Sequence, residues 1–400
     1  MRRGAFLKNY YSPTIYFLLG FLAFSPFCGW LVLEYLQFPV SLTELFLLAL
    51  IPFLPNELKK CFAFNFSVFI KSLTLLLLLL LVGIIYGEYS LYSLVACFRI
   101  YLYLIICLSF SVNKRGPDIN ILSIIAIGSV IGWIFCSFYT LSHFDPTDSE
   151  TSLVTIGNML AVPLVIFSTL MSRKTGMFVI SLIICIILSF ACAMRRELFV
   201  LVEAIIFCAF LYKGAGAKTI KRSIITVSVL LIILFPQISG YLKEEYPLLH
   251  YRIIEKSSQL ISGEKEEADK EREKEYGFFY NSILIDPIPK GLVSRNTAKD
   301  DLSGLFIDLP LAEVLYTFGN IGGICFILKF YSYYYKCRKR YQRNKDVYRQ
   351  LVMFMILIMG SLLFVEGTFL SANYTVPVTG FFIGQLIYFG KKEKNYKYAN

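Results

Sequence analysis

The stretch FSVFIKSLTLLLLLLLVGIIY, residues 66–86, decides the fold class of this chain. It carries a single charged residue, Lys71, over about 20 positions, the length that an α-helix needs to cross ~30 Å of hydrocarbon. Comparable apolar runs recur along the 400 residues, of which 56% are hydrophobic and 16% aromatic. The chain is therefore predicted to be an all-α polytopic membrane protein.

Apolar runs of spanning length predict about twelve transmembrane helices. We expect them at residues 13–35, 40–54, 66–86, 91–111, 119–140, 152–171, 176–194, 198–212, 223–239, 309–331, 351–366 and 374–389. The run at 40–54 is short, so it is expected to be a tilted or re-entrant piece. No internal repeat is visible in the sequence.

The charges between these runs predict the topology. Links rich in Lys and Arg, from Arg2 and Arg3 to the tail with Lys391, alternate with acidic or uncharged links such as 145–150. By the positive-inside rule both termini are cytoplasmic. Residues 1–240 then hold helices one to nine and 241–308 form one large extracytoplasmic loop. Residues 309–400 hold the last three helices and a basic cytoplasmic tail.

Arg195 and Arg196 depart from this charge pattern, because they fall in a short link on the predicted outer side. Arginine forms bidentate, charge-assisted hydrogen bonds with phosphate, so the pair suggests an anionic ligand. Snorkelling to lipid phosphate is the alternative. Further charged residues within spans lie towards the outer face, and such groups usually line a cavity or pair with one another. They are Glu44, Arg99, Glu203, Glu313 and Glu366.

Composition excludes several other classes. The net charge of +11 falls mainly in links and tails, which favours topology and anionic lipid contact over nucleic-acid binding. The ten cysteines lie mostly in apolar runs without a CxxC pair, and there are two histidines, so no metal centre or disulfide framework is expected. No G-x-x-x-x-G-K-[ST] loop is present, so no nucleotide cofactor is expected.

The order of the predicted spans and the large loop, together with two segments of the sequence, resembles a known family. Residues 188–201, LSFACAMRRELFVL, are similar to an apolar helix ending in Ser/Thr-x-Arg at the outer face, with Ala193 in the Ser/Thr place. Residues 281–323 contain a Pro/Gly turn, DPIPKG, and later the glycine-rich GNIGG of a following helix. In these respects the chain resembles the Wzy-type polymerases of O-antigen and capsular repeat units and their relatives, the O-antigen ligases.

The resemblance implies a metal-independent glycosyltransferase in the bacterial cytoplasmic (inner) membrane, with its site on the periplasmic face. Its substrates would be oligosaccharides linked to undecaprenyl pyrophosphate, and its partners membrane lipids and a chain-length regulator. Pyrophosphate would be bound by arginines drawn from Arg195, Arg196, Arg252, Arg295 and Arg99. The general base would be one of Asp308, Glu313, His250 and Glu366.

Alternatives remain open at this point. The ligases carry a histidine at the head of the helix after the loop, where this chain has Ile307-Asp308-Leu309, so polymerase is favoured over transfer of polymer to lipid A core. A flippase of lipid-linked oligosaccharide is the third reading, although transporters often contain repeats. Asp308 also fits a helix N-cap before Pro310, and His250 also fits an ordinary loop histidine.

Overall fold

Helices are the only regular secondary structure in the described part of the computed structural model, which confirms the all-α expectation. The structure describes residues 54–86, 119–142, 160–171, 175–191, 195–213, 216–255, 279–292, 310–344, 347–364 and 376–391, with some residues of 13–21, 98–108 and 258–277. Contacts divide the chain into two compact units. Unit 1 is Met1–Leu42 with Asp118–Lys265, and unit 2 is Thr43–Pro117 with Glu266–Asn400.

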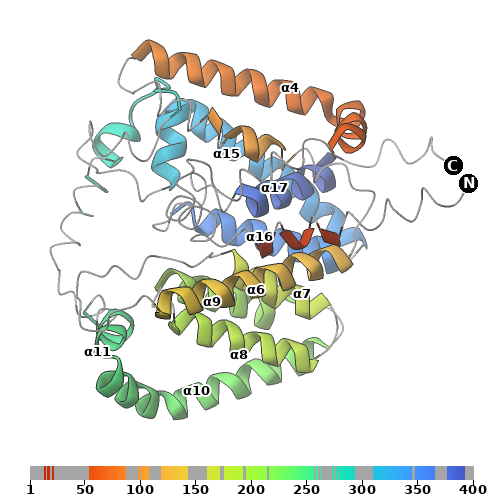
Figure 1. Cartoon of the computed structure of the whole chain (residues 1–400). Helices are drawn as coiled ribbons and strands as arrows, with labels where there is room; N and C mark the ends of the chain where they lie inside the picture. The colour runs from red at the N-terminus through yellow and green to blue at the C-terminus, as the bar shows by residue number, and fades with distance from the viewer. Residues whose placement is uncertain are drawn as a thin grey trace, which may run out of the picture. The chain divides into compact units, whose positions relative to one another are not determined.

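Unit 1 is a helical bundle whose elements follow one another along the chain (Figure 1). They are α6 (Ile119–Ser142), α7 (Ala161–Met171), α8 (Thr175–Ala191), α9 (Arg195–Ile206), the π-helical turn η2 (Phe207–Leu211), α10 (Ala217–Glu245), α11 (Pro247–His250) and the π-helical turn η3 (Tyr251–Glu255). Helix α7 packs against α6, α8 and α9. Its residues are apolar almost all round, and Val162, Leu164 and Phe167 are fully buried, as expected of a central helix.

A close helix contact joins the N-terminal residues to α6. Ser129 donates a hydrogen bond through Oγ to the carbonyl oxygen of Gly20, at 3.3 Å. A Cβ at Gly20 would collide with the carbonyl of Ile125, and a Cβ at Gly128 would collide with the carbonyl of Phe17. Small residues here allow the two backbones to approach closely, as at many helix crossings in membrane proteins.

Unit 2 is also helical in its described part. Its elements are α4 (Leu54–Tyr86), the π-helical turn η4 (Phe279–Ile283), α15 (Pro310–Asn344), α16 (Val347–Ser361) and α17 (Val376–Lys391). Helix α15 packs against α16 and α17, and those two pack against each other. The buried side chains of α16 and α17, such as Leu351, Ile358 and Phe382, form much of the core. The backbone of α15 leaves helical geometry once, at Gly319 (φ 69°, ψ 161°).

Among the described residues, two helices are long and apolar enough to cross a membrane, Ala217–Glu245 and Pro310–Gln342. Only 11% of the most apolar window of the first is buried. Its outward residues include Ile225, Ile232 and Ile233, each at least 61% exposed. Exposed aliphatic surface of this extent is typical of contact with lipid or another apolar partner. The other apolar stretches found among the described residues, such as Phe69–Ile85 within α4, are 10–17 residues long, so the twelve predicted spans stay a prediction.

Several element boundaries differ from the predicted spans. Helix α4 begins at Leu54 rather than at 66, and α15 continues to Asn344 rather than ending at 331. Hydropathy marks only the apolar part of a helix, whereas backbone hydrogen bonding continues through its polar ends. The predicted topological boundaries at 240 and 308 describe sides of a membrane, and the grouping by contacts does not test them.

The glycine contact generates a first prediction. Gly128→Ala should destabilise unit 1 by about 1–3 kcal/mol, because the added methyl group must displace the backbone at Phe17. Thermal unfolding of the purified protein in detergent measures this effect. Gly176→Ala is the matched control, since a Cβ there meets nothing within 4 Å. Equal melting temperatures for the two variants would contradict the close contact.

Candidate functional site

The structure distributes the predicted site residues over both units. Arg195, Arg196, Arg252 and His250 lie in unit 1, and Arg99 and Glu313 lie in unit 2. Three further candidates, Asp308, Arg295 and Glu366, lie outside the described residues. Within the described part of the chain, no group of three or more His, Cys, Asp or Glu side chains could hold a metal ion.

Arg195 and Arg196 are the first two residues of α9, not a link between two helices. The opening turn of a helix has backbone N–H groups without intrahelical acceptors and carries the positive end of the helix dipole. Positive side chains in this position are unfavourable unless an anion balances them. Glu197, the next residue, is an acidic group of the same turn and is fully buried. The start of α9 is therefore a concentration of positive charge with one buried carboxyl group beside it.

A small apolar cluster attaches the segment around His250 to the beginning of α9. Its buried members are Leu242, Leu249 and Ile253, which come from α10, α11 and η3. Leu198 of α9 and Phe190 near the end of α8 pack against them. Leu198 lies in the first turn of α9, with the two arginines. The cluster thus brings the arginine-bearing end of α9 and the His250 segment to the same end of unit 1.

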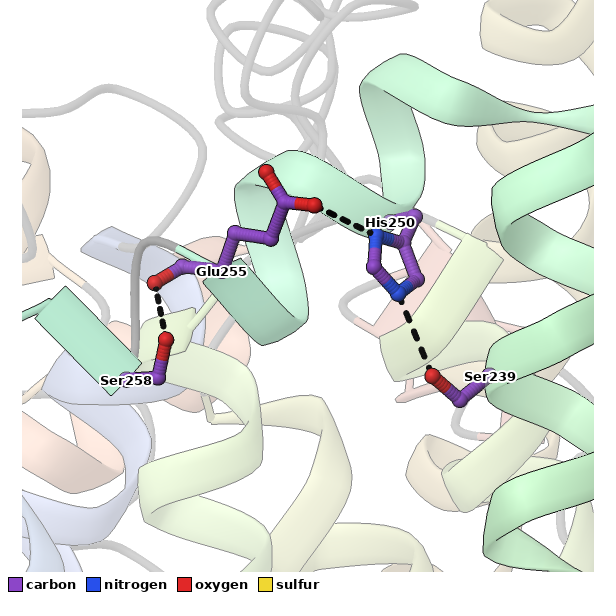
Figure 2. A network of polar contacts seen from close by, with 4 residues as sticks. All are labelled: Ser239, His250, Glu255 and Ser258. Atoms are coloured by element: carbon purple, nitrogen blue, oxygen red, sulfur yellow. Dashed lines mark hydrogen bonds and ion pairs between the residues drawn. The ribbon is translucent and has the colours of Figure 1, made fainter.

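His250 is buried, with 6% of its surface exposed, and both ring nitrogens have polar contacts (Figure 2). Nε2 lies 3.1 Å from Oγ of Ser239 on α10. Nδ1 lies 3.3 Å from Oε1 of Glu255, at the end of η3. A carboxylate is only an acceptor, so Glu255 favours the proton on Nδ1 and leaves the lone pair on Nε2. This arrangement makes Nε2 a hydrogen-bond acceptor for a hydroxyl group.

Glu313 is a buried candidate for the general base in unit 2. Glu313 lies in the first turn of α15, is 9% exposed, and accepts a 3.2 Å hydrogen bond from the hydroxyl of Tyr101. The helix dipole favours negative charge there. Arg99 lies two residues before Tyr101 in the same helical segment. The described residues of unit 2 therefore include one candidate base, Glu313, and one candidate cation, Arg99.

The Pro/Gly turn of residues 284–292 docks on the break in α15. The backbone N–H groups of Lys290 and Gly291 donate to the carbonyls of Tyr316 and Thr317, at 3.1 and 3.3 Å. The N–H of Asn320 donates to the carbonyl of Asp286, at 2.9 Å. A break at Gly319 removes helical partners from groups on both sides of it, and the docked turn replaces them.

Side chains fix the shape of the docked turn. Asp286 accepts a 2.9 Å hydrogen bond from the N–H of Ile288 and lies 3.3 Å from Nζ of Lys290. The hydrogen bond from the N–H of Ile288 is the main cause of a lowered pKa of the Asp286 carboxyl; burial opposes it, and Lys290 adds to the lowering. Sequence reasoning noted the DPIPKG turn without assigning these residues. Two features of the sequence could have indicated the docked turn. Asp286 and Lys290 lie four residues apart directly before Gly291, and Gly319 lies within a helical stretch.

Comparison with protein-family models, curated proteins and solved structures finds no match to this chain. The resemblance to the polysaccharide polymerases therefore rests on the sequence features alone.

The turn generates a second prediction, with a definite pH dependence. Because the folded pKa of Asp286 lies below its unfolded value of about 3.9, the carboxylate stabilises the fold at neutral pH. That contribution is lost as the pH falls through the folded pKa. Asp286→Asn should therefore melt a few degrees below the parent protein at pH 7, and the difference should shrink under acid conditions.

Thermal unfolding at a series of pH values measures both quantities. Glu244→Gln is the control, because it removes an exposed carboxyl group from α10 and leaves the turn intact. A difference between Asp286→Asn and the parent that is constant down to low pH would show that the carboxylate charge is not what fixes the turn.

Proposed function

We propose that the chain polymerises oligosaccharide repeat units linked to undecaprenyl pyrophosphate, on the outer face of the bacterial cytoplasmic membrane. The observation that carries the proposal is the apolar cluster of unit 1, in which Leu198 packs against Leu249 and Ile253. It brings an arginine pair suited to a pyrophosphate to the same end of one unit as a histidine whose Nε2 faces a hydroxyl group.

The direction of α10 supports the same assignment independently. The first two turns of the helix contain Lys218, Lys221 and Arg222, and its last turn contains Lys243 with Glu244 and Glu245. The positive-inside rule puts its beginning in the cytoplasm and its end outside. With 29 residues it is about 43 Å long, enough to cross the bilayer. His250 follows its outer end, and the charge pattern of the other links puts the start of α9 on that side as well.

The proposed reaction needs two contributions from the protein. His250 removes the proton from a sugar hydroxyl of one repeat unit, and the hydroxyl oxygen attacks the anomeric carbon of the growing chain. The bond from that carbon to the pyrophosphate oxygen breaks, and the leaving group gains negative charge. Arg195 and Arg196, together with the backbone N–H groups at the start of α9, are suited to stabilise that charge. Arg252, in η3 after His250, is a further candidate.

Other assignments make different use of the same residues. Arg99 and Glu313 belong to unit 2, where Glu313 is the alternative base and Tyr101 its hydrogen-bond donor. A ligase would transfer finished polymer to lipid A core, and a flippase would move the lipid-linked unit without chemistry. The glycan of a strain lacking the protein separates the three. Single repeats on core indicate a polymerase, free lipid-linked polymer a ligase, and cytoplasmic accumulation a flippase.

The arginine pair generates the third prediction. Arg195→Ala and Arg196→Ala should each reduce long-chain polysaccharide by about 10²-fold, the cost of removing one group that stabilises the leaving charge. Glycan length is measured by gel electrophoresis in the deletion strain carrying each variant at equal membrane levels. Arg338→Ala, which removes an exposed charge from the end of α15, is the control. Full-length polymer from both variants would exclude a pyrophosphate site at α9.

The choice of base generates the fourth prediction. His250→Ala should abolish polymerisation, whereas Glu313→Gln should retain it, because the amide keeps an acceptor for the hydroxyl of Tyr101. The same glycan assay compares the two variants. The reverse result, with Glu313→Gln inactive and His250→Ala active, would move the base to unit 2.

A further inference from the structure

We infer that Glu255 is a positioning residue that holds His250 in its Nδ1–H tautomer, and that Oγ of Ser239 occupies the place of the acceptor's hydroxyl. The inference rests on the proposed function and deepens it, because it assigns the group that prepares the base and the position from which the sugar hydroxyl reacts. Figure 2 shows the three side chains in one line, with the imidazole in the middle.

The π-helical turn explains why Glu255 reaches His250. The two residues are five positions apart, and in an α-helix such residues point in directions about 140° apart. Hydrogen bonds in a π-helix run from i to i+5, so the turn is wider and residue i+5 lies almost above residue i. Residues Tyr251–Glu255 form such a turn directly after His250. The extra residue of the turn thus brings the carboxyl group back over the imidazole.

The two side chains in this contact differ in their exposure to solvent. The side chain of His250 is 8% exposed, whereas that of Glu255 is 46% exposed. The carboxyl group therefore keeps contact with solvent while it accepts from Nδ1 at the edge of the protein. The opposite nitrogen, Nε2, faces inward to α10, where Ser239 is partly buried. With Nδ1 protonated, the hydroxyl of Ser239 donates to Nε2.

The distance between Ser239 and His250 has a chemical meaning. A general base must lie about 2.6–3.2 Å from the oxygen whose proton it removes. Oγ of Ser239 lies 3.1 Å from Nε2, within that interval. The serine hydroxyl is an alcohol, as is the hydroxyl of a sugar. Rotation about the Cα–Cβ bond of Ser239 would move Oγ away from Nε2 and leave room for a substrate hydroxyl. The structure thus holds the base with its acceptor side already facing a hydroxyl group.

A neighbouring serine provides a matched control. Ser258 donates through Oγ to the backbone carbonyl of Glu255, at 2.7 Å, on the other side of that residue from its carboxyl group (Figure 2). Glu255→Ala removes the carboxyl group that faces Nδ1. Ser258→Ala removes only a hydroxyl group, which bonds to the backbone of the same residue, so it should leave the tautomer as it is.

The composition of the chain allows a direct measurement. His143 and His250 are the only histidines, so His143→Gln leaves a single imidazole. The full-length protein is labelled with ¹⁵N-histidine, purified into lipid nanodiscs, and examined by ¹⁵N NMR at a pH where the ring is neutral. We expect a protonated Nδ1 and an unprotonated Nε2 in the parent protein and in Ser258→Ala. Glu255→Ala should transfer a large share of the proton to Nε2.

The result that would overturn the inference is an Nε2–H tautomer in the parent protein, or a tautomer that Glu255→Ala does not change. In the glycan assay Glu255→Ala should reduce polymer by about 10²–10⁴-fold, the contribution of a correctly prepared base. If the tautomer changes but polymer does not, the carboxyl group orients the ring without serving the reaction, and the inference fails. If His250→Ala itself keeps polymer, His250 is not the base, and the assignment of the base to unit 1 fails together with this inference.

Ser239 has its own test. A serine that stands in for a substrate hydroxyl should not react with a fluorophosphonate probe, whereas an activated nucleophile should. We expect no labelling of the parent protein in nanodiscs. Labelling that is lost in Ser239→Ala and kept in Ser258→Ala would show that Ser239 itself attacks the substrate, which would overturn its role as a stand-in for the acceptor.

Discussion

Every backbone N–H and C=O in an apolar environment must have a hydrogen-bond partner, and much of this structure follows from that requirement. An α-helix meets it locally, which is why a chain so rich in leucine, isoleucine and phenylalanine is helical in its described parts. The π-helical turns meet it with a wider ring, as in the hydrogen bond from the N–H of Tyr212 to the carbonyl of Phe207. Where α15 breaks at Gly319, the docked turn of residues 284–292 supplies the missing partners. The backbone does not lose hydrogen bonds where it departs from α-helical geometry at Gly319, because the docked turn provides them.

The second organising feature is the way in which charge is placed. Arg195 and Arg196 concentrate positive charge where a helix already presents its N–H groups, and Glu197 is buried in the same turn. Glu313 sits at the start of α15, where the dipole favours a carboxylate. Both helix starts therefore contain an acidic residue, but only the start of α9 also carries two arginines. The arginine pair is for that reason the candidate for binding a phosphate group.

The helical class was predictable from runs such as residues 66–86, because side-chain hydropathy alone determines it. The ends of helices were less predictable: α4 starts at Leu54, before its apolar part, and Arg195 begins a helix although its charge marked it as part of a link. The break at Gly319 was not predictable, since GNIGG also fits an unbroken helix, and only the docking of Pro287 and Lys290 makes the break favourable. Likewise, the histidine was a candidate by its residue type. Its contacts with Ser239 and Glu255 depend on a π-helical turn that hydropathy cannot detect.

The π-helical turn after His250 also has a consequence for how such sites diverge. A π turn differs from an α turn by one inserted residue, so deletion of one residue between His250 and Glu255 would restore an ordinary helical turn. The carboxyl group would then be four positions from the histidine, again on the same face. One arrangement of side chains therefore corresponds to two spacings, H-x-x-x-E and H-x-x-x-x-E. Alignments that forbid a gap at this point would separate proteins whose sites have the same geometry.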